Sequence, residues 1–254
     1  MINHVLKVNQ LIDSELDVVY QSNNSHSLAK KMSLQATLDY PSQPIFALIP
    51  IKESHCTQTL VVYENHLELV ALTGLAIIKA LHVRLVMYPI RPFQKALRHC
   101  FDKKLYKIPM CTPKFCLMPL AGKRDPNGIW VNPVAIQTIY DTEFQTEIHL
   151  TNQLLLAATT KKKSLKTQIK HSLLCLAIIR LLFGIEPEPP DKNLSLQKLL
   201  NIQLTEDSIL LAILKDLYVK DLPCSREEFY ALFKKFERLE YQWLDLECEG
   251  ESFD

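Results

Sequence analysis

Residues 184–193, with the sequence GIEPEPPDKN, interrupt the regular secondary structure that the rest of the chain predicts. The stretch holds a helix-ending glycine, three prolines and alternating acidic residues, so it can neither continue a helix nor pair in the centre of a sheet. We interpret it as a linker. The 254 residues suffice for one large domain or two small ones. We therefore expect a domain over residues 1–183 and a C-terminal segment over 194–254.

The two parts carry opposite net charges. Residues 183–254 hold 8 Lys and Arg residues against 16 Asp and Glu residues, and residues 1–182 hold 21 against 12, so the net charges are about −8 and +9. The whole chain has a formal net charge of only +1, which conceals this division. An asymmetry of this kind indicates a polyanionic partner for the basic part.

The positive charge is concentrated between Arg84 and Arg124, where ten Lys and Arg residues accompany a single acid, Asp102. Surface charges of one sign repel one another, so such an excess requires a compensating interaction. Phosphates provide it, because cations along a nucleic-acid backbone release condensed counterions. The predicted DNA contacts in this span are Arg84, Arg91, Lys95, Arg98, Lys103, Lys104, Lys107, Lys114, Lys123 and Arg124.

A second basic run begins at Lys161 and opens a helix that we expect from about Ser164 onward. Cations at this position oppose the positive end of the helix dipole, at a cost of roughly a few tenths of a kcal/mol each. The pattern leaves two interpretations open, a phosphate-binding face or a solvated lysine face without a partner. We add its lysines to the predicted DNA contacts, namely Lys162, Lys163, Lys166 and Lys170.

The basic part is expected to have an α+β fold with an antiparallel sheet. Apolar and β-rich patterns predict strands over 45–51, 58–64, 130–140 and 145–150, and a buried helix over 74–85. In the last strand Thr146, Ile148 and Leu150 alternate with polar residues, which predicts one buried face and one wet face. Between two strands, the residues DPNG at 125–128 predict a turn that exposes Lys123 and Arg124. Trp130, which follows, is expected in the core rather than as a stacking platform.

The C-terminal segment is expected to be a small all-helical unit. Thr205 is a candidate helix cap, and Ser225 with Glu228 forms a predicted capping box. After the capping box, apolar residues recur at spacings of three and four and form one continuous stripe. Two interpretations remain open: packing onto neighbouring C-terminal helices, or a seam for a partner or a second copy. The candidate partner-binding residues are Phe229, Leu232, Phe236, Leu239 and Trp243.

The order of elements between residues 45 and 182 carries a family resemblance. The quoted segments are IFALIPI, TLVVYE, LAIIKALH, the basic span, KIPM, FCLMPL, the turn, IWVN, TEFQTEIHLTN and SLKTQIKHSL. In this order the chain resembles the competence transcription factor family (ComK-type), which are bacterial DNA-binding activators. The resemblance implies selective binding to A·T-rich promoter DNA, minor-groove contacts and two copies on spaced half-sites. It therefore implies an activator of competence (DNA uptake) genes that forms a homodimer or a larger assembly on double-stranded DNA.

The chain also departs from the family pattern. It has YPIRPFQKALRH at 88–99 where the family has a glycine- and serine-rich loop, and Met118, Pro119 and Leu120 where the family has phenylalanine, proline and threonine. Gly128 replaces a cysteine that often stands two residues before the tryptophan, and a glycine turn expected near Asn152 is absent. The contacts of the family loop therefore do not carry over, although Arg91 and Lys95 provide equivalent charge.

Two other classes of function compete with DNA binding. An enzyme is disfavoured, because the chain has five glycines and lacks the GxGxxG, GxxxxGK[ST], GxSxG and HExxH motifs. No cofactor or metal is expected, since Cys111 and Cys116, with His99 and Cys100, do not have the spacing of a common zinc site. The second alternative is a non-enzymatic adaptor module that has lost its DNA contacts.

The acidic C-terminal segment suggests regulation, either by folding back over the basic surface as a DNA mimic or by binding a regulatory protein. Seven scattered cysteines indicate a reducing compartment, and the chain has neither a signal-peptide pattern nor an apolar run long enough to span a membrane. We therefore expect a cytoplasmic protein.

Overall fold

The computed structural model describes residues 6–7, 18–20, 33–35, 43–53, 56–85, 89–102, 105, 107–120, 128–182 and 191–250. For the strands before residue 43, for 52–53 and 56–57 and for 242–250, it describes the backbone alone. Lys103, Lys104, Lys123, Arg124 and most of the expected linker lie outside these residues. Within them, no helix has the length and apolar character needed to cross a membrane.

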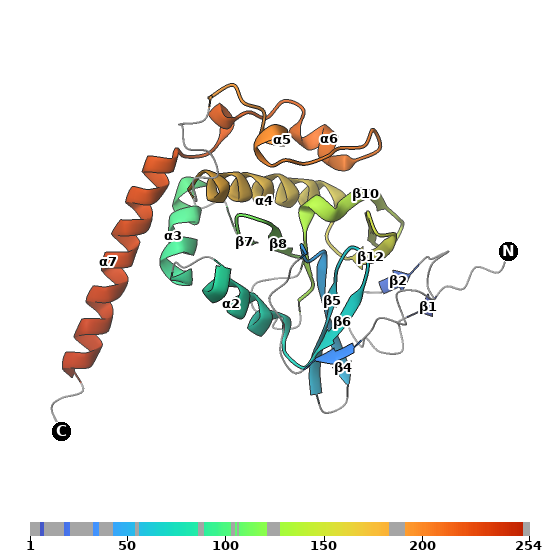
Figure 1. Ribbon diagram of the computed structural model, residues 1–254, viewed down its shortest axis with the longest axis horizontal. Helices are drawn as coiled ribbons and strands as arrows, with labels where there is room; N and C mark the ends of the chain where they lie inside the picture. Colours follow the sequence, from blue (N-terminus) through green and yellow to red (C-terminus); the bar gives the residue numbers. More distant parts are fainter. Residues whose placement is uncertain are drawn as a thin grey trace.

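The fold is α+β, as the sequence predicts, with two sheets and helices packed against them (Figure 1). All strand pairs are antiparallel except β3 with β6. The five-stranded sheet has the order β1 (Leu6–Lys7), β2 (Val18–Tyr20), β12 (Leu154–Ala158), β11 (Thr146–Leu150) and β10 (Ile136–Asp141). The seven-stranded sheet has the order β3 (Ser33–Gln35), β6 (Leu67–Val70), β5 (Cys56–Val62), β4 (Ala47–Glu53), β9 (Trp130–Val131), β8 (Cys116–Pro119) and β7 (Met110–Cys111).

The helices form two groups along the chain. The first group is α2 (Gly74–Leu85), α3 (Ile90–Cys100), the short 3₁₀ helix η2 (Pro133–Ala135) and α4 (Lys162–Leu182). The second group is α5 (Leu196–Leu199), α6 (Ile209–Leu214), η3 (Val219–Asp221) and α7 (Arg226–Gly250). Helix α4 lies between the strands β7 and β8 on one side and the helices α5 and α6 on the other, and α7 runs beside α3 (Figure 1).

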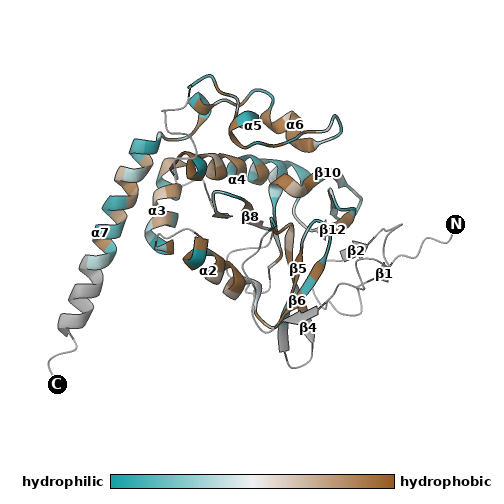
Figure 2. Cartoon of the chain, viewed as in Figure 1, coloured by the Kyte–Doolittle hydropathy of each residue, from teal (hydrophilic) through white to brown (hydrophobic). Residues whose placement is uncertain are grey.

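The alternation expected in β11 is confirmed. Thr146, Ile148 and Leu150 are buried, whereas Glu147 and His149 are partly exposed. Ile148 and Leu150 belong to the main hydrophobic core, which also contains the inward face of α4. In Figure 2 the strands β5 and β8 and much of α4 have hydrophobic colours, because these elements enclose the core. Trp130 is half-buried against a second apolar cluster that includes Ile77 and Leu81.

The single strand expected over 130–140 is wrong. The chain leaves the seven-stranded sheet after β9, forms η2, and enters the five-stranded sheet as β10. Asn132 fixes this crossing: its side-chain oxygen accepts a hydrogen bond from the backbone N–H of Val134 at 3.0 Å, and its amide donates to the carbonyl of Ile45 at 3.2 Å. Pro133 has no N–H to continue a ladder. The break therefore connects the two sheets.

Of the two expected helix caps, one is confirmed and one is wrong. The backbone N–H of Ser225 donates to the Glu228 carboxylate at 2.7 Å, and the N–H of Glu228 donates to the Ser225 hydroxyl at 3.1 Å, as a capping box requires. Thr205 caps no helix. Its carbonyl accepts from the N–H of Ser208 in a turn, and Ser208 then caps α6 by accepting from the N–H of Leu210 at 3.2 Å.

The C-terminal helices share the core of the basic part. Phe229 and Phe233 of α7 are each 1% exposed, and the Phe229 ring meets the Phe93 ring of α3 edge-on at 5.5 Å between centroids. Buried residues of α5 and α6, Leu196 and Leu214 among them, join the same core as α4. The apolar stripe of α7 thus packs on α3 and α4 rather than only on neighbouring C-terminal helices.

Candidate nucleic-acid interface

The first half of α4 presents one exposed basic face. Lys163, Lys166 and Lys170 recur at spacings of three and four and are exposed, whereas Leu165 and Ile169 between them are fully buried. We call these three residues the lysine face. Among the described residues, no carboxylate oxygen lies within 4.0 Å of their ammonium nitrogens. Lys161, just before the helix, is also exposed.

The start of α4 is fixed to the hairpin of β10 and β11 through Asp141. One oxygen of this carboxylate accepts from the backbone N–H of Lys162 at 3.2 Å and from the hydroxyl of Thr146 at 2.8 Å. It thus pairs one of the N–H groups that a helix start leaves without a partner. The Lys162 ammonium lies over the Tyr140 ring, 5.9 Å from its centroid, so Lys162 is partly withdrawn from the lysine face.

Lys107 points inward instead of toward a ligand. It is half-buried, and its ammonium donates to the carbonyl of Leu120, which also accepts from the hydroxyl of Thr160 at 3.5 Å. Burial lowers the pKa of Lys107 below its ordinary value. Gln168 of α4 donates to the neighbouring carbonyl of Pro119. The end of β8 is therefore held against the first half of α4, and the segment with Lys123 and Arg124 follows directly after it in the sequence.

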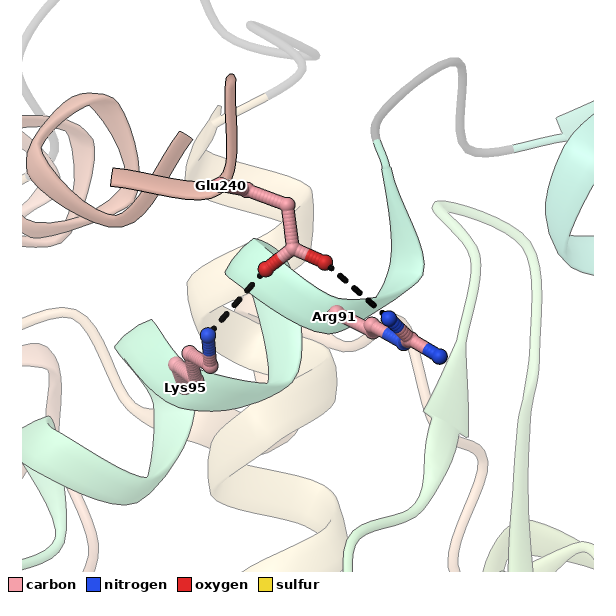
Figure 3. A network of polar contacts seen from close by, with 3 residues as sticks. All are labelled: Arg91, Lys95 and Glu240. Carbon is pink, nitrogen blue, oxygen red and sulfur yellow. Dashed lines mark hydrogen bonds and ion pairs between the residues drawn. The ribbon is translucent and has the colours of Figure 1, made fainter. Parts of the chain in front are cut away.

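Two of the expected DNA contacts on α3 are paired within the chain. Glu240 of α7 bridges Lys95, with 3.1 Å between Nζ and Oε2, and Arg91, with 3.5 Å between Nη1 and Oε1 (Figure 3). The cation side chains are 52% and 81% exposed respectively, so the pairs lie at the surface. The hydrogen bond from Lys95 and the charges of both cations lower the pKa of Glu240. The acidic helix α7 thus compensates two of the cations of α3.

The remaining described cations are distributed over other parts of the fold. Arg84 ends α2, Arg98 lies in the last turn of α3, and Lys114 lies in the turn between β7 and β8; all three are exposed, and Arg84 and Lys114 make further interactions. The carbonyl of Lys114 contacts Arg180 near the end of α4. That position is about 25 Å along the helix from Lys163, at 1.5 Å per residue. The cations expected to form one DNA-binding surface are therefore divided among α2, α3 and the two ends of α4.

The side chains of the candidate partner-binding stripe on α7 are buried at the start of the helix and become more exposed toward its end. Phe229 is buried, Leu232 and Phe236 are half-buried, and Leu239 is 41% exposed. The side chain of Trp243 lies outside the described residues. Because Phe229 packs within the chain, a partner cannot reach it without displacing α7.

Arg180 is a structural residue that sequence reasoning did not single out. Its guanidinium donates to the carbonyls of Pro113 at 3.0 Å, Leu199 at 3.2 Å and Lys114 at 3.5 Å. Burial lowers its pKa below the ordinary value. In the sequence it is recognisable as the one Lys, Arg, Asp or Glu residue in the apolar second half of α4.

The cysteines near this region do not form a metal centre in the described part of the chain. Cys111 and Cys116 face each other across β7 and β8, with 3.2 Å between their sulfur atoms, and both are buried. Burial raises the pKa of both thiols, which favours the neutral form. Among the described residues, no three His, Cys, Asp or Glu side chains are grouped so that they could hold a metal ion.

Comparison of the chain with protein-family models, with curated proteins and with solved structures returned no match.

Proposed function

We propose that the protein binds double-stranded DNA through the lysine face of α4 and activates transcription of competence genes from A·T-rich promoters. The supporting observation is the contrast between two basic helices. On α3, Arg91 and Lys95 share the Glu240 carboxylate, whereas the lysine face has no carboxylate within 4.0 Å among the described residues. Like charges on one face repel one another. Phosphates would remove this repulsion and release counterions.

The promoter class, the regulated genes and the assembly of two copies come from the family resemblance. The preference for A·T-rich DNA is compatible with the lysine face, because the narrow minor groove of A-tracts has an enhanced negative potential that attracts inserted cations. A cytoplasmic location and a homodimer or larger assembly belong to the same proposal.

An electrophoretic mobility shift of an A·T-rich duplex, repeated across a salt series, tests the proposal. We expect retardation that persists in excess non-specific competitor. If three lysines contact phosphates, a plot of the logarithm of the association constant against the logarithm of salt concentration should have a slope of about −2.7 or steeper. No shift even at about 50 mM salt would contradict DNA binding.

A second candidate function is a protein-interaction module that has lost its DNA contacts. The observation in its favour is the pairing of Arg91 and Lys95 with Glu240, since these two cations are the replacements for the family's DNA-contacting loop. The same shift experiment separates the two candidates, because the module would leave A·T-rich duplex unbound.

Because Glu240 of α7 pairs with two cations of α3, we expect Glu240→Gln to change the affinity for duplex DNA. Removing this carboxylate leaves Arg91 and Lys95 uncompensated, which increases the positive potential toward DNA. Exposed ion pairs contribute roughly 0–1 kcal/mol, so we expect duplex affinity to rise by up to about fivefold. Fluorescence anisotropy with labelled duplex measures the change.

The matched control is Glu237→Gln, whose carboxylate pairs at 2.7 Å with Lys234 of the same helix. It removes the same charge and keeps the carboxylate that Arg91 and Lys95 share. Equal affinities for the two variants, or weaker binding by Glu240→Gln, would count against restraint by α7. Deleting residues 184–254 is a poorer test, because it would uncover core contacts made by Phe229 and Leu214.

A further inference from the structure

The turn between β10 and β11 exposes a large apolar side chain. Phe144 is 88% exposed, the highest fraction among the large hydrophobic side chains of the described residues. The turn that carries it is closed by hydrogen bonds: the N–H and the hydroxyl of Thr142 donate to the carbonyl of Gln145 at 2.8 and 2.9 Å, and the N–H of Gln145 donates back to the Thr142 hydroxyl at 3.2 Å. The ring is therefore presented on a fixed tip, and ordering it on binding costs little entropy.

The tip and the lysine face belong to one corner of the molecule. Asp141, directly before the turn, accepts from the hydroxyl of Thr146 directly after it and from the backbone N–H of Lys162 at the start of α4. Lys162 also lies over the Tyr140 ring. These contacts hold the Phe144 turn beside the first turn of α4, where the lysine face begins.

The lysine face has dimensions that suit a duplex. Lys163 and Lys170 are seven residues apart, which is about 10.5 Å along a helix. This length is close to the rise of three base pairs, at about 3.4 Å each along one strand. A duplex lying along α4 with its phosphates on the lysines would bring its groove near the hairpin tip.

We propose that Phe144 is a wedge that inserts between base pairs of duplex DNA held on the lysine face. The inference rests on the proposed function and deepens it by assigning the residue that deforms the DNA. Apolar wedges unstack a base step and kink the duplex by roughly 20–90°. The flexible TA steps of A·T-rich sequences lower the cost of that deformation. Burial of the ring offsets part of the remaining cost.

A membrane surface is the competing partner for an exposed ring beside lysines. The turn itself carries one large apolar side chain, Phe144, which is 88% exposed, and the exposed carboxylate of Glu143 lies next to it; the Tyr140 ring of β10 is 52% exposed and lies under the Lys162 ammonium. Insertion into a bilayer surface needs an extended apolar face. A wedge needs only one side chain. The single ring therefore favours duplex DNA.

The test compares Phe144→Ser and Phe144→Leu in the full chain, with an A·T-rich duplex labelled at both ends for fluorescence energy transfer. Phe144→Ser should bind about tenfold more weakly and leave the duplex straight, because the apolar contact is lost. Phe144→Leu should keep most of the bend, since leucine is also an effective wedge. Glu143→Gln in the same turn is the matched control and should not reduce bending. Because Phe144 is exposed, thermal unfolding should be unchanged in all three variants.

The outcomes distinguish the wedge from DNA binding itself. If Phe144→Ser binds and bends the duplex like the wild type while Lys166→Glu weakens binding, the wedge is wrong and the DNA-binding surface stands. If the wild-type chain does not bind duplex at low salt, the proposed function fails and the wedge fails with it. Phosphatidylserine vesicles are the third arm: wild-type binding to them that Phe144→Ser abolishes, with duplex binding unaffected, would assign the tip to membranes and overturn the wedge.

Discussion

Replacing Lys163, Lys166 and Lys170 together by glutamate is expected to weaken binding to an A·T-rich duplex by on the order of 100-fold at about 0.1 M salt. The change turns three exposed cations into anions on the surface that we assign to phosphates. The salt dependence should also become shallower, by about 0.9 in the slope for each lost phosphate contact. Titrations followed by fluorescence anisotropy at several salt concentrations measure both effects.

The matched control reverses three exposed lysines of the C-terminal segment, Lys192, Lys198 and Lys220. It changes the net charge by the same amount and leaves the first half of α4 intact. If the two triple variants lose affinity equally, the whole-molecule charge rather than the lysine face determines binding. Circular dichroism should show the same helical content in both, because all six side chains are exposed.

Phe229→Ala is expected to lower the free energy of unfolding by about 3–5 kcal/mol. The side chain is 1% exposed and contacts Phe93 of α3, so its removal leaves a cavity between α7 and the basic part. Since both parts share one core, the chain should still unfold in a single transition. Urea unfolding, followed by circular dichroism and by tryptophan fluorescence, measures both quantities.

Tyr230→Ala provides the control, because the neighbouring side chain is 48% exposed and its loss should cost no more than about 0.5–1 kcal/mol. Two separate transitions in Phe229→Ala would show that the C-terminal helices are stabilised independently of the core.

Local patterns predicted a large part of the fold. The helix over 74–85, the alternation in β11 and the capping box at Ser225 follow from side chains close in sequence, and each is confirmed. The break at Asn132 has a local signal, because Pro133 has no N–H to continue a ladder, whereas its second anchor, the carbonyl of Ile45, lies 87 residues away. The packing of Phe229 on α3 was missed because its partner, Phe93, is also far from it in the sequence.

In the candidate interface too, features set by neighbouring residues could be predicted, whereas contacts between residues far apart in the sequence could not. The run of lysines at the start of α4 was visible in the sequence, but the burial of Leu165 and Ile169 was needed to show that Lys163, Lys166 and Lys170 share one exposed face. A count of charges could not show that Glu240 compensates Arg91, because the two residues are 149 positions apart. Nor could it show that Lys107 points inward to a carbonyl, since that depends on how β8 ends against α4.

Arg180 adds polar bonds between α4, the β7–β8 turn and α5, which also share the hydrophobic core. Its planar guanidinium binds carbonyls of the β7–β8 turn and of α5 at once, and a lysine, with the same charge but no planar fork of donors, would not reproduce this geometry. Because Arg180 lies near the end of α4, these bonds fix that end of the helix to α5 and to the β7–β8 turn, and Lys163 of the lysine face lies about 25 Å away toward the other end.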